Sequence, residues 1–526
     1  MRATPKAYGA YNIYARAKDS VGTGRISEEA SERFYVAVPK EAGLWDMNLV
    51  VQSGVGRIAP DSNPSGTTKN PLSLHGWATT WSEDGPGRAG KMPPPAGEVQ
   101  ERMDTSLTFS GVEHAQTAAK VLTTASSFSV SAWVYLKDGE SPARAILSQF
   151  NADNSAGVDL RYQRAQNTWG MCWSYTTVEG RKCATVLGPD NAAIKNAWTH
   201  VAGVYDSSAN KLILYINGRF AGERVLTAAE KPQTTGGPLV VGKSPFYAFN
   251  GLVDEVRVWN QAIDADFMLT RATYADRNPY GGNEDPSEAT GGSLVSLVGS
   301  WDASIAGMAD QSYFGRGTLQ KSASGVSFDN QRGMVMDGAS GSLTGAGPFL
   351  DETGSFTLSA IVDVDLADLI DKPAGHQARI MGQSAGPGQS SWALWFVKKS
   401  GVGEPVAGYW AVGRWEKPIL AGAEPQVADE DAFSEQASVD QTTVNAVYDS
   451  INQKLTVFEG SDERGSITFT KPVQGSGSFY VGWGADSQAG RFDGAIQKVQ
   501  LWAGAMDATQ LSGIGQLTQL NEVVTP

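Results

Sequence analysis

A set of strand-like segments occurs twice along this chain, in the same order and at nearly the same spacing. The clearest pair is residues 127–134 and 355–362, in which apolar and polar side chains alternate in the same way. Such alternation places every second side chain on one face of a β-strand. The repeat predicts two tandem copies of one β-domain. The paired segments begin at residues 127 and 355, 204 and 447, 239 and 479, and 249 and 492.

Turn signals and short apolar runs favour an all-β fold within each copy. The apolar run at 212–216 is typical of a buried strand, and Asn217-Gly218 after it is a strong hairpin signal because both residues tolerate positive φ. The 60 glycines and 24 prolines also fit many turns. Helical periodicity is weak, with one short closing helix expected at 263–271 and its counterpart at 506–514. Many short strands of this kind predict β-sandwiches.

Four segments are therefore expected along the chain. Residues 1–40 hold two strand-like runs that resemble the end of a fibronectin-type-III domain. Residues 41–275 form the first sandwich, and residues 276–292, rich in Pro, Gly, Asn and acidic side chains, form a linker. Residues 293–526 form the second, more divergent sandwich.

Charge and hydropathy exclude several classes of protein. The net charge is −14, which argues against a nucleic-acid-binding protein because phosphate recognition needs a basic face. The sequence contains no stretch of about 18 uncharged apolar residues, so no membrane insertion is expected. No signal peptide is visible near the start. We expect a chain that is part of a longer polypeptide or of a larger assembly.

Cys172 and Cys183 are the only cysteines. Cys172 falls within a strand-like run at 169–175, and a turn at 176–180 would return Cys183 toward it. A disulfide is therefore expected, with two reduced thiols as the alternative. A disulfide implies an oxidising compartment.

Four segments carry a family resemblance: residues 127–134, 198–206, 214–218 and 251–259. Together they resemble the laminin-G-like, concanavalin A-like jelly-roll family, in the form found in large surface proteins of actinobacteria. The resemblance implies two face-packed antiparallel sheets per copy, an extracellular or cell-surface location, and recognition or adhesion more often than catalysis. Relatives often hold calcium at a rim, but no calcium motif matches residue by residue.

The sequence offers no pair of catalytic carboxylates. Hydrolysis of a glycosidic bond needs two acidic groups flanking that bond, and on a strand this calls for a pattern such as Glu-x-Asp, which is absent. We therefore expect no enzyme, with a glycoside hydrolase or lyase as the minor alternative.

Candidate calcium ligands are Asp206 and Asp254. Asp206 follows a strand at a turn, where an aspartate also serves by bonding the local backbone. Asp254 precedes Glu255 in a strand, where structural pairing is the other interpretation. The second copy lacks this acidic pair, the cysteines and the Asn-Gly turn, so any metal or ligand site is expected in the first copy.

Trp169, Trp173 and Tyr175 are candidate ligand-binding residues, since they fall on one face of a strand and could stack on a sugar. Such a ladder also suits a hydrophobic core. The function expected from the sequence is a non-catalytic extracellular module for recognition or adhesion, which binds a glycan or a protein surface with calcium as the candidate cofactor. The alternative is a structural component of a particle such as a phage tail, displayed on a virion surface.

Overall fold

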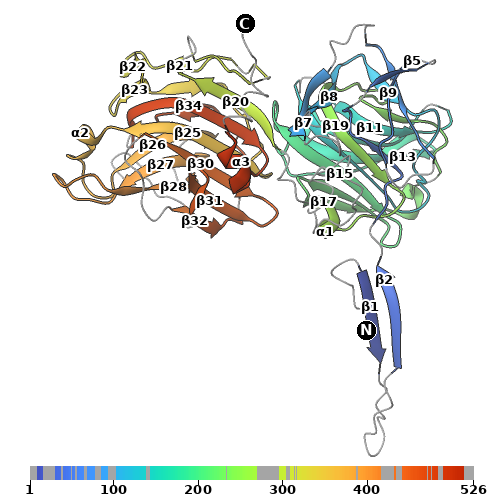
Figure 1. Ribbon diagram of the computed structural model, residues 1–526. Coiled ribbons are helices and arrows are strands. Elements are labelled where there is room, and N and C mark those ends of the chain that lie inside the picture. Colours follow the sequence, from blue (N-terminus) through green and yellow to red (C-terminus); the bar gives the residue numbers. More distant parts are fainter. Residues whose placement is uncertain are drawn as a thin grey trace, which may run out of the picture.

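The computed structural model describes residues 9–15, 30–36, most of 39–77, 84–92, most of 102–268, most of 295–415, 432–433 and most of 441–514. It is nearly all β, as predicted, with antiparallel sheets packed as two sandwiches (Figure 1). The helices in the described residues are short: α1 (Ala265–Phe267), α2 (Leu366–Leu369) and α3 (Ala508–Ser512). None of the helices described is long and apolar enough to cross a membrane.

The first sandwich consists of an eight-stranded and a nine-stranded sheet. The eight-stranded sheet has the order β17 (Arg219–Val225), β16 (Lys211–Ile216), β15 (Trp198–Asp206), β10 (Phe128–Leu136), β19 (Asn250–Trp259), β8 (Arg102–Ser110) and β7 (Asp84–Met92), and β3 (Gly43–Trp45) pairs with β19. The nine-stranded sheet has the order β14 (Gly180–Leu187), β13 (Thr168–Thr177), β12 (Ala156–Gln163), β11 (Ala143–Phe150), β18 (Leu239–Val241), β9 (His114–Gln116), β6 (Leu72–His75), β5 (Gly56–Ala59) and β4 (Val51–Ser53).

The second sandwich repeats this arrangement. One sheet has the order β22 (Val326–Asp329), β23 (Gly333–Asp337), β34 (Asp493–Ala503), β25 (Phe356–Val364), β30 (Thr442–Asp449), β31 (Lys454–Glu459) and β32 (Asp462–Thr468), and β20 (Ser296–Asp302) pairs with β34. The other has the order β21 (Gln320–Lys321), β24 (Leu343–Gly345), β33 (Phe479–Val481), β26 (Gln377–Gly386), β27 (Gln389–Lys398), β28 (Gly408–Trp415) and β29 (Ala432–Phe433). The order β17-β16-β15-β10-β19 thus has its counterpart in β32-β31-β30-β25-β34.

The remaining predicted segments are only partly described. β1 (Gly9–Ala15) and β2 (Ala30–Val36) pair antiparallel in a ribbon of their own (Figure 1). The predicted linker at 276–292 lies outside the described residues. Among the described residues, α1 and α3 fall within the helices expected at 263–271 and 506–514; residues 269–271 lie outside the described part. Each helix begins after an aspartate N-cap, Asp264 or Asp507, whose carboxylate accepts a backbone N–H.

Alternation within strands builds the core and also joins the sandwiches. In β10, Val130, Ala132 and Val134 face the core of the first sandwich. Trp133 and Tyr135 point the other way and belong to the hydrophobic cluster of the second sandwich. The ring of Tyr135 stacks on Phe314, with 5.1 Å between ring centroids.

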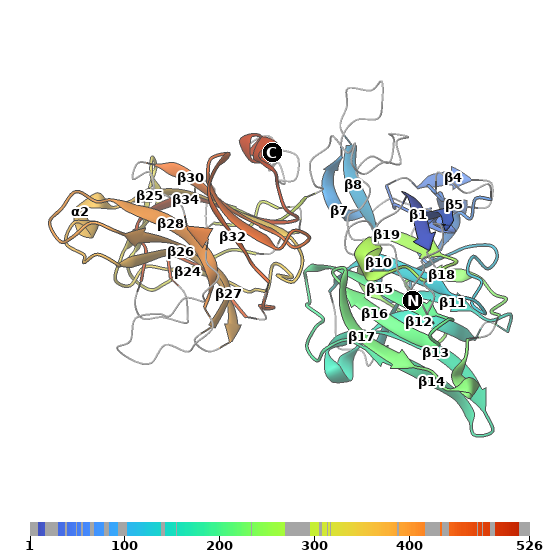
Figure 2. The same cartoon turned by 90° about the horizontal axis from the view of Figure 1, so that it is seen from below.

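The two sandwiches lie side by side (Figure 2), and hydrogen bonds between side chains join them. The Thr199 hydroxyl donates to the Asp351 carboxylate at 2.9 Å, and both residues are buried. The Asn217 amide donates to the Thr353 hydroxyl at 2.7 Å. Asn217 and Gly218 have φ values of 48° and 74°, as the predicted hairpin turn requires. The outer face of the eight-stranded sheet of the first sandwich is therefore a contact surface for the second.

Candidate functional site

A line of mostly polar side chains crosses the outer face of the nine-stranded sheet. Its members are successive register partners on neighbouring strands, so their side chains project from the same face. Residues that flank them in each strand, such as Leu160 and Met171, belong to the hydrophobic core. We call this line the outer row: Ser73, Gln116, Val240, Ser148, Asp159, Cys172 and Thr185.

Asp159 and Arg161 form the charged centre of this face. The two residues alternate outward in β12, and Arg161 Nε lies 3.5 Å from Asp159 Oδ1, an ion pair rather than a short hydrogen bond. Asp159 is 4% exposed. Burial raises the pKa of its carboxyl, and the charge of Arg161 opposes that rise.

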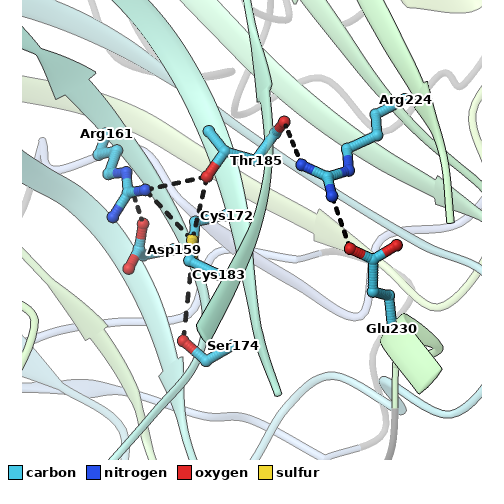
Figure 3. The surroundings of a disulfide bond; sticks show 8 residues. All are labelled: Asp159, Arg161, Cys172, Ser174, Cys183, Thr185, Arg224 and Glu230. Carbon is cyan, nitrogen blue, oxygen red and sulfur yellow. Dashed lines mark hydrogen bonds and ion pairs between the residues drawn. A yellow bond between two sulfur atoms is a disulfide. The ribbon is translucent and has the colours of Figure 1, made fainter. Parts of the chain in front are cut away.

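The Arg161 guanidinium is held in place from its other side (Figure 3). One terminal nitrogen lies 3.2 Å from Thr185 Oγ1 and 3.2 Å from Cys183 Sγ. Arg224, on the opposite sheet, donates a hydrogen bond to the carbonyl oxygen of Thr185 at 3.4 Å. The same guanidinium forms an ion pair with Glu230 at 2.5 Å. Arg161 is thereby oriented before any ligand arrives, which lowers the entropic cost of binding.

Two buried oxygens at the centre of the outer row lack hydrogen-bond partners among the described residues. They are Ser148 Oγ and Asp159 Oδ1. The two residues lie directly opposite each other in the β11–β12 register, and Ser148 is 0% exposed. Buried polar atoms are almost always hydrogen-bonded in folded proteins, so unsatisfied ones mark a place for water or a ligand group.

The predicted disulfide is present and lies at one end of this face. Cys172 and Cys183 are bonded, with 5.7 Å between their Cα atoms. Their register partners are Thr185 and Ser174, so the bond runs diagonally between β13 and β14. It ties these neighbouring strands together beside Arg161 (Figure 3).

The aromatic candidates lie on the opposite face of β13. Trp169 and Trp173 are 0% and 3% exposed and pack in the core of the first sandwich, and Tyr175 packs against that core while half-buried. Alternation explains this placement, because Cys172 and Ser174 between them face outward. The rings of Trp169 and Trp173 offer no open face on which a sugar from solvent could stack.

The two calcium candidates lie far apart. Asp206 closes the β15–β16 turn, where its carboxylate accepts from Ser208 N at 2.8 Å and from Ser208 Oγ at 2.7 Å. Burial is the largest single influence and raises the pKa of Asp206, but the hydrogen bonds from Ser208 and Ala209 and the charge of Lys211 together outweigh it, so the net shift is downward.

Asp254 lies instead within the sheet. It is buried at a bulge in β19, where its carboxylate accepts from Glu255 N at 2.7 Å and Glu255 has a φ of 46°. Its register row includes His200, six residues from Asp206 along β15, or about 20 Å at the rise of a strand. No cluster of three or more metal-ligating side chains occurs in the described part of the chain.

The second sandwich has no equivalent of the polar centre. Its corresponding row, traced through the same strand order, consists of Thr344, Tyr480, Gly382, Ala393 and Gly413. Ala393 stands where the first sandwich has Asp159, and Gly382 stands where it has Ser148. Two residues further along the strand, Trp395 replaces Arg161 and is buried in an apolar cluster. The polar centre is therefore particular to the first sandwich.

The sequence-based search missed Ser148, Asp159 and Arg161. Alternation in residues 156–163 signals a strand with a charged face. The partners of that strand come from residues far away in the sequence, so the row emerges only with the register.

Comparison with known proteins gives one family match, to part of the first sandwich. The family model described as the concanavalin A-like lectin/glucanases superfamily matches residues 109–266. No curated protein matches the sequence.

Several solved structures show a likeness to parts of the chain. The CBM40 domain of the Ruminococcus gnavus IT-sialidase, bound to α2,3-sialyllactose, is 17% identical, with a TM-score of 0.24, over 27% of this chain and 81% of its own. Domain 4 of AbnA, a Geobacillus stearothermophilus arabinanase, in complex with arabinotriose, is 13% identical, with a TM-score of 0.29, over 43% and 99%. The binding domain of Botulinum neurotoxin DC, in complex with rat synaptotagmin II, is 8% identical, with a TM-score of 0.33, over 89% and 99%. Scores at this level say nothing about the ligand of this chain.

Proposed function

We propose that this chain is a non-catalytic recognition module of an extracellular or cell-surface protein, and that its first sandwich binds a saccharide through the outer row. The observation that carries the proposal is the oriented Arg161 beside two buried oxygens, Ser148 Oγ and Asp159 Oδ1, that accept no hydrogen bond from the described residues. A fixed guanidinium donates paired hydrogen bonds, and Ser148 and Asp159 supply acceptors. Neighbouring hydroxyls of one sugar ring need this combination of donors and acceptors.

A binding role suits the outer row better than hydrolysis does. Acid/base cleavage of a glycosidic bond uses two carboxyl groups, about 5–5.5 Å apart for retention and about 6.5–9.5 Å apart for inversion. The outer row contains one carboxylate, Asp159, and that group is paired with Arg161. The superfamily that matches residues 109–266 includes lectins as well as glucanases.

Two further features support the rest of the proposal. The disulfide fits an extracellular location, since such bonds persist in oxidising compartments. The matching strand orders support an origin of the two sandwiches as tandem copies that later took different roles. The second sandwich, whose corresponding row lacks charge, would then serve as a packing partner.

The test is a glycan-array screen of the full chain, with calcium and again with a chelator, followed by titration of any saccharide that binds. Arg161→Gln is expected to weaken binding about tenfold or more, because a hydrogen bond from a charged group contributes about 1.5–3 kcal/mol. Arg332→Gln is the matched control, since this arginine pairs with Asp363 in the second sandwich, away from the outer row. Ser148→Ala, which removes a buried unsatisfied oxygen, provides a second variant that should fold.

Equal saccharide affinity for wild type, Arg161→Gln and Ser148→Ala would overturn the assignment of the site. Hydrolysis of a bound saccharide would overturn the non-catalytic role. Binding to protein surfaces alone would replace the saccharide by a protein partner. Binding lost with the chelator would show that calcium assists recognition.

A further inference from the structure

Two histidines face each other near one end of the same outer face. His75 and His114 are direct register partners across β6 and β9, two residues beyond the Ser73–Gln116 pair of the outer row. Their rings are stacked, with centroids 4.8 Å apart and planes inclined by 13°. His75 is exposed and His114 is half-buried, so the pair is open to solvent on one side.

The imidazole of His114 has a ring nitrogen, Nδ1, that no described residue engages in a hydrogen bond. A neutral imidazole with an unshared nitrogen lone pair is the form that binds metals.

We propose that His75 and His114 together bind one divalent transition-metal ion, of the Zn²⁺, Cu²⁺ or Ni²⁺ type, with water completing its coordination. Imidazole suits these ions, whereas Ca²⁺ and Mg²⁺ prefer oxygen ligands. Two nitrogens on one such ion lie about 3 Å apart, given metal–nitrogen distances of about 2.0–2.1 Å. Side-chain rotation alone brings the rings to this spacing, because directly opposed Cβ atoms on antiparallel strands are about 4.5–5.5 Å apart.

The charged neighbours of the pair set its expected strength. Glu113 precedes His114, but its carboxylate is engaged by Ser110, accepting from the backbone N–H at 2.6 Å and from the hydroxyl at 2.8 Å. Lys243 follows β18 and adds positive charge beside His114. The site therefore offers two nitrogen ligands, and the positive charge of Lys243 repels a bound metal ion. Removal of that charge should increase the affinity for metal. This proposal does not depend on saccharide binding.

The experiment is isothermal titration of the full chain with ZnCl₂ and separately with NiCl₂, backed by equilibrium dialysis and by circular dichroism of each variant. We expect one equivalent of metal on the wild type. His75→Ala and His114→Ala should each weaken binding by at least about tenfold, since loss of even an outer-shell partner costs 10–100-fold. Lys243→Gln should strengthen binding, and His376→Ala, which removes an imidazole of the second sandwich, is the matched control.

Three results would refute the metal site. One is unchanged affinity in both histidine variants, and another is no binding by the wild type up to millimolar metal. The third is weaker rather than tighter binding in Lys243→Gln with the fold intact. His75→Ala carries the test if His114→Ala fails to fold, because His75 is exposed.

Discussion

Burial of Glu352 predicts that the second sandwich loses stability as the pH rises. The side chain is 1% exposed and lines a cavity with Phe356 and Trp392. Burial raises the pKa of its carboxyl from 4.5 to about 8, although Gly475 N and Ser391 Oγ each donate a hydrogen bond to it at 2.8 Å. The loss of hydration therefore outweighs the hydrogen bonds.

The direction of the pH dependence follows from proton counting. Between the two pKa values the folded chain keeps a proton on Glu352 that the unfolded chain has released. The free energy of unfolding then falls as the pH rises, by about 1.4 kcal/mol per pH unit, or roughly 2.7 kcal/mol from pH 5.5 to 7.5. Below the unfolded pKa both states are protonated, so the contribution is fully present there and is lost as the pH approaches about 8.

The measurement is urea unfolding of wild type and Glu352→Gln at pH 5.5, 6.5 and 7.5, followed by tryptophan fluorescence. The glutamine cannot titrate, so the difference in unfolding free energy between the two proteins should change by about 2–3 kcal/mol over this range. Asp493 also titrates in this pH range, because burial and Asp368 raise its pKa to about 7. Asp493 is present in both proteins, so its contribution cancels in the difference. A difference that stays constant with pH would show that Glu352 is ionised in the folded chain.

Three further changes test the disulfide, the junction and the turn at Asp206. Replacing Cys172 and Cys183 together by serine should destabilise the first sandwich by about 3 kcal/mol, because the disulfide closes a loop with a sequence separation of 11. Urea unfolding of the wild type with and without reductant should give the same difference in unfolding free energy, and no difference would contradict the loop-entropy argument. Tyr135→Ala should lower the free energy of unfolding by about 3–5 kcal/mol through the loss of its buried contact with Phe314. Calorimetry should then show separate unfolding transitions for the two sandwiches. An unchanged calorimetric profile would show that the junction does not couple their unfolding. Asp206→Ala should lower stability by about 1 kcal/mol in thermal unfolding, because its turn hydrogen bonds are lost. The loss of stability should be the same with calcium and with chelator. A loss of stability seen with calcium alone would support Asp206 as a metal ligand.

Features set by nearby residues could be predicted from the sequence. The all-β fold follows from alternation, and the turn at Asn217-Gly218 follows from two residues that tolerate positive φ. The disulfide joins strands of a single hairpin, so residues close in sequence defined it. Each of these depends on contacts over a short stretch of chain.

Features set by register could not be predicted in the same way. Ser148 meets Asp159, and His75 meets His114, only because the strands pair with one particular offset. A slip of one residue would turn all of these side chains to the other face. Trp169 shows the same limit, since alternation identified its shared face but not which face was the core.

The junction between the sandwiches has a consequence for valency. The second sandwich covers part of the outer face of the eight-stranded sheet, whereas the outer row lies on the other sheet of the first sandwich. We therefore expect an isolated chain to coat a saccharide-bearing surface through this sandwich and to block other binders there, without bridging two surfaces. Many copies displayed on one support would gain avidity from effective concentration. Copies displayed together on one support would then agglutinate saccharide-bearing particles, whereas the free chain would compete with other binders for the same saccharides.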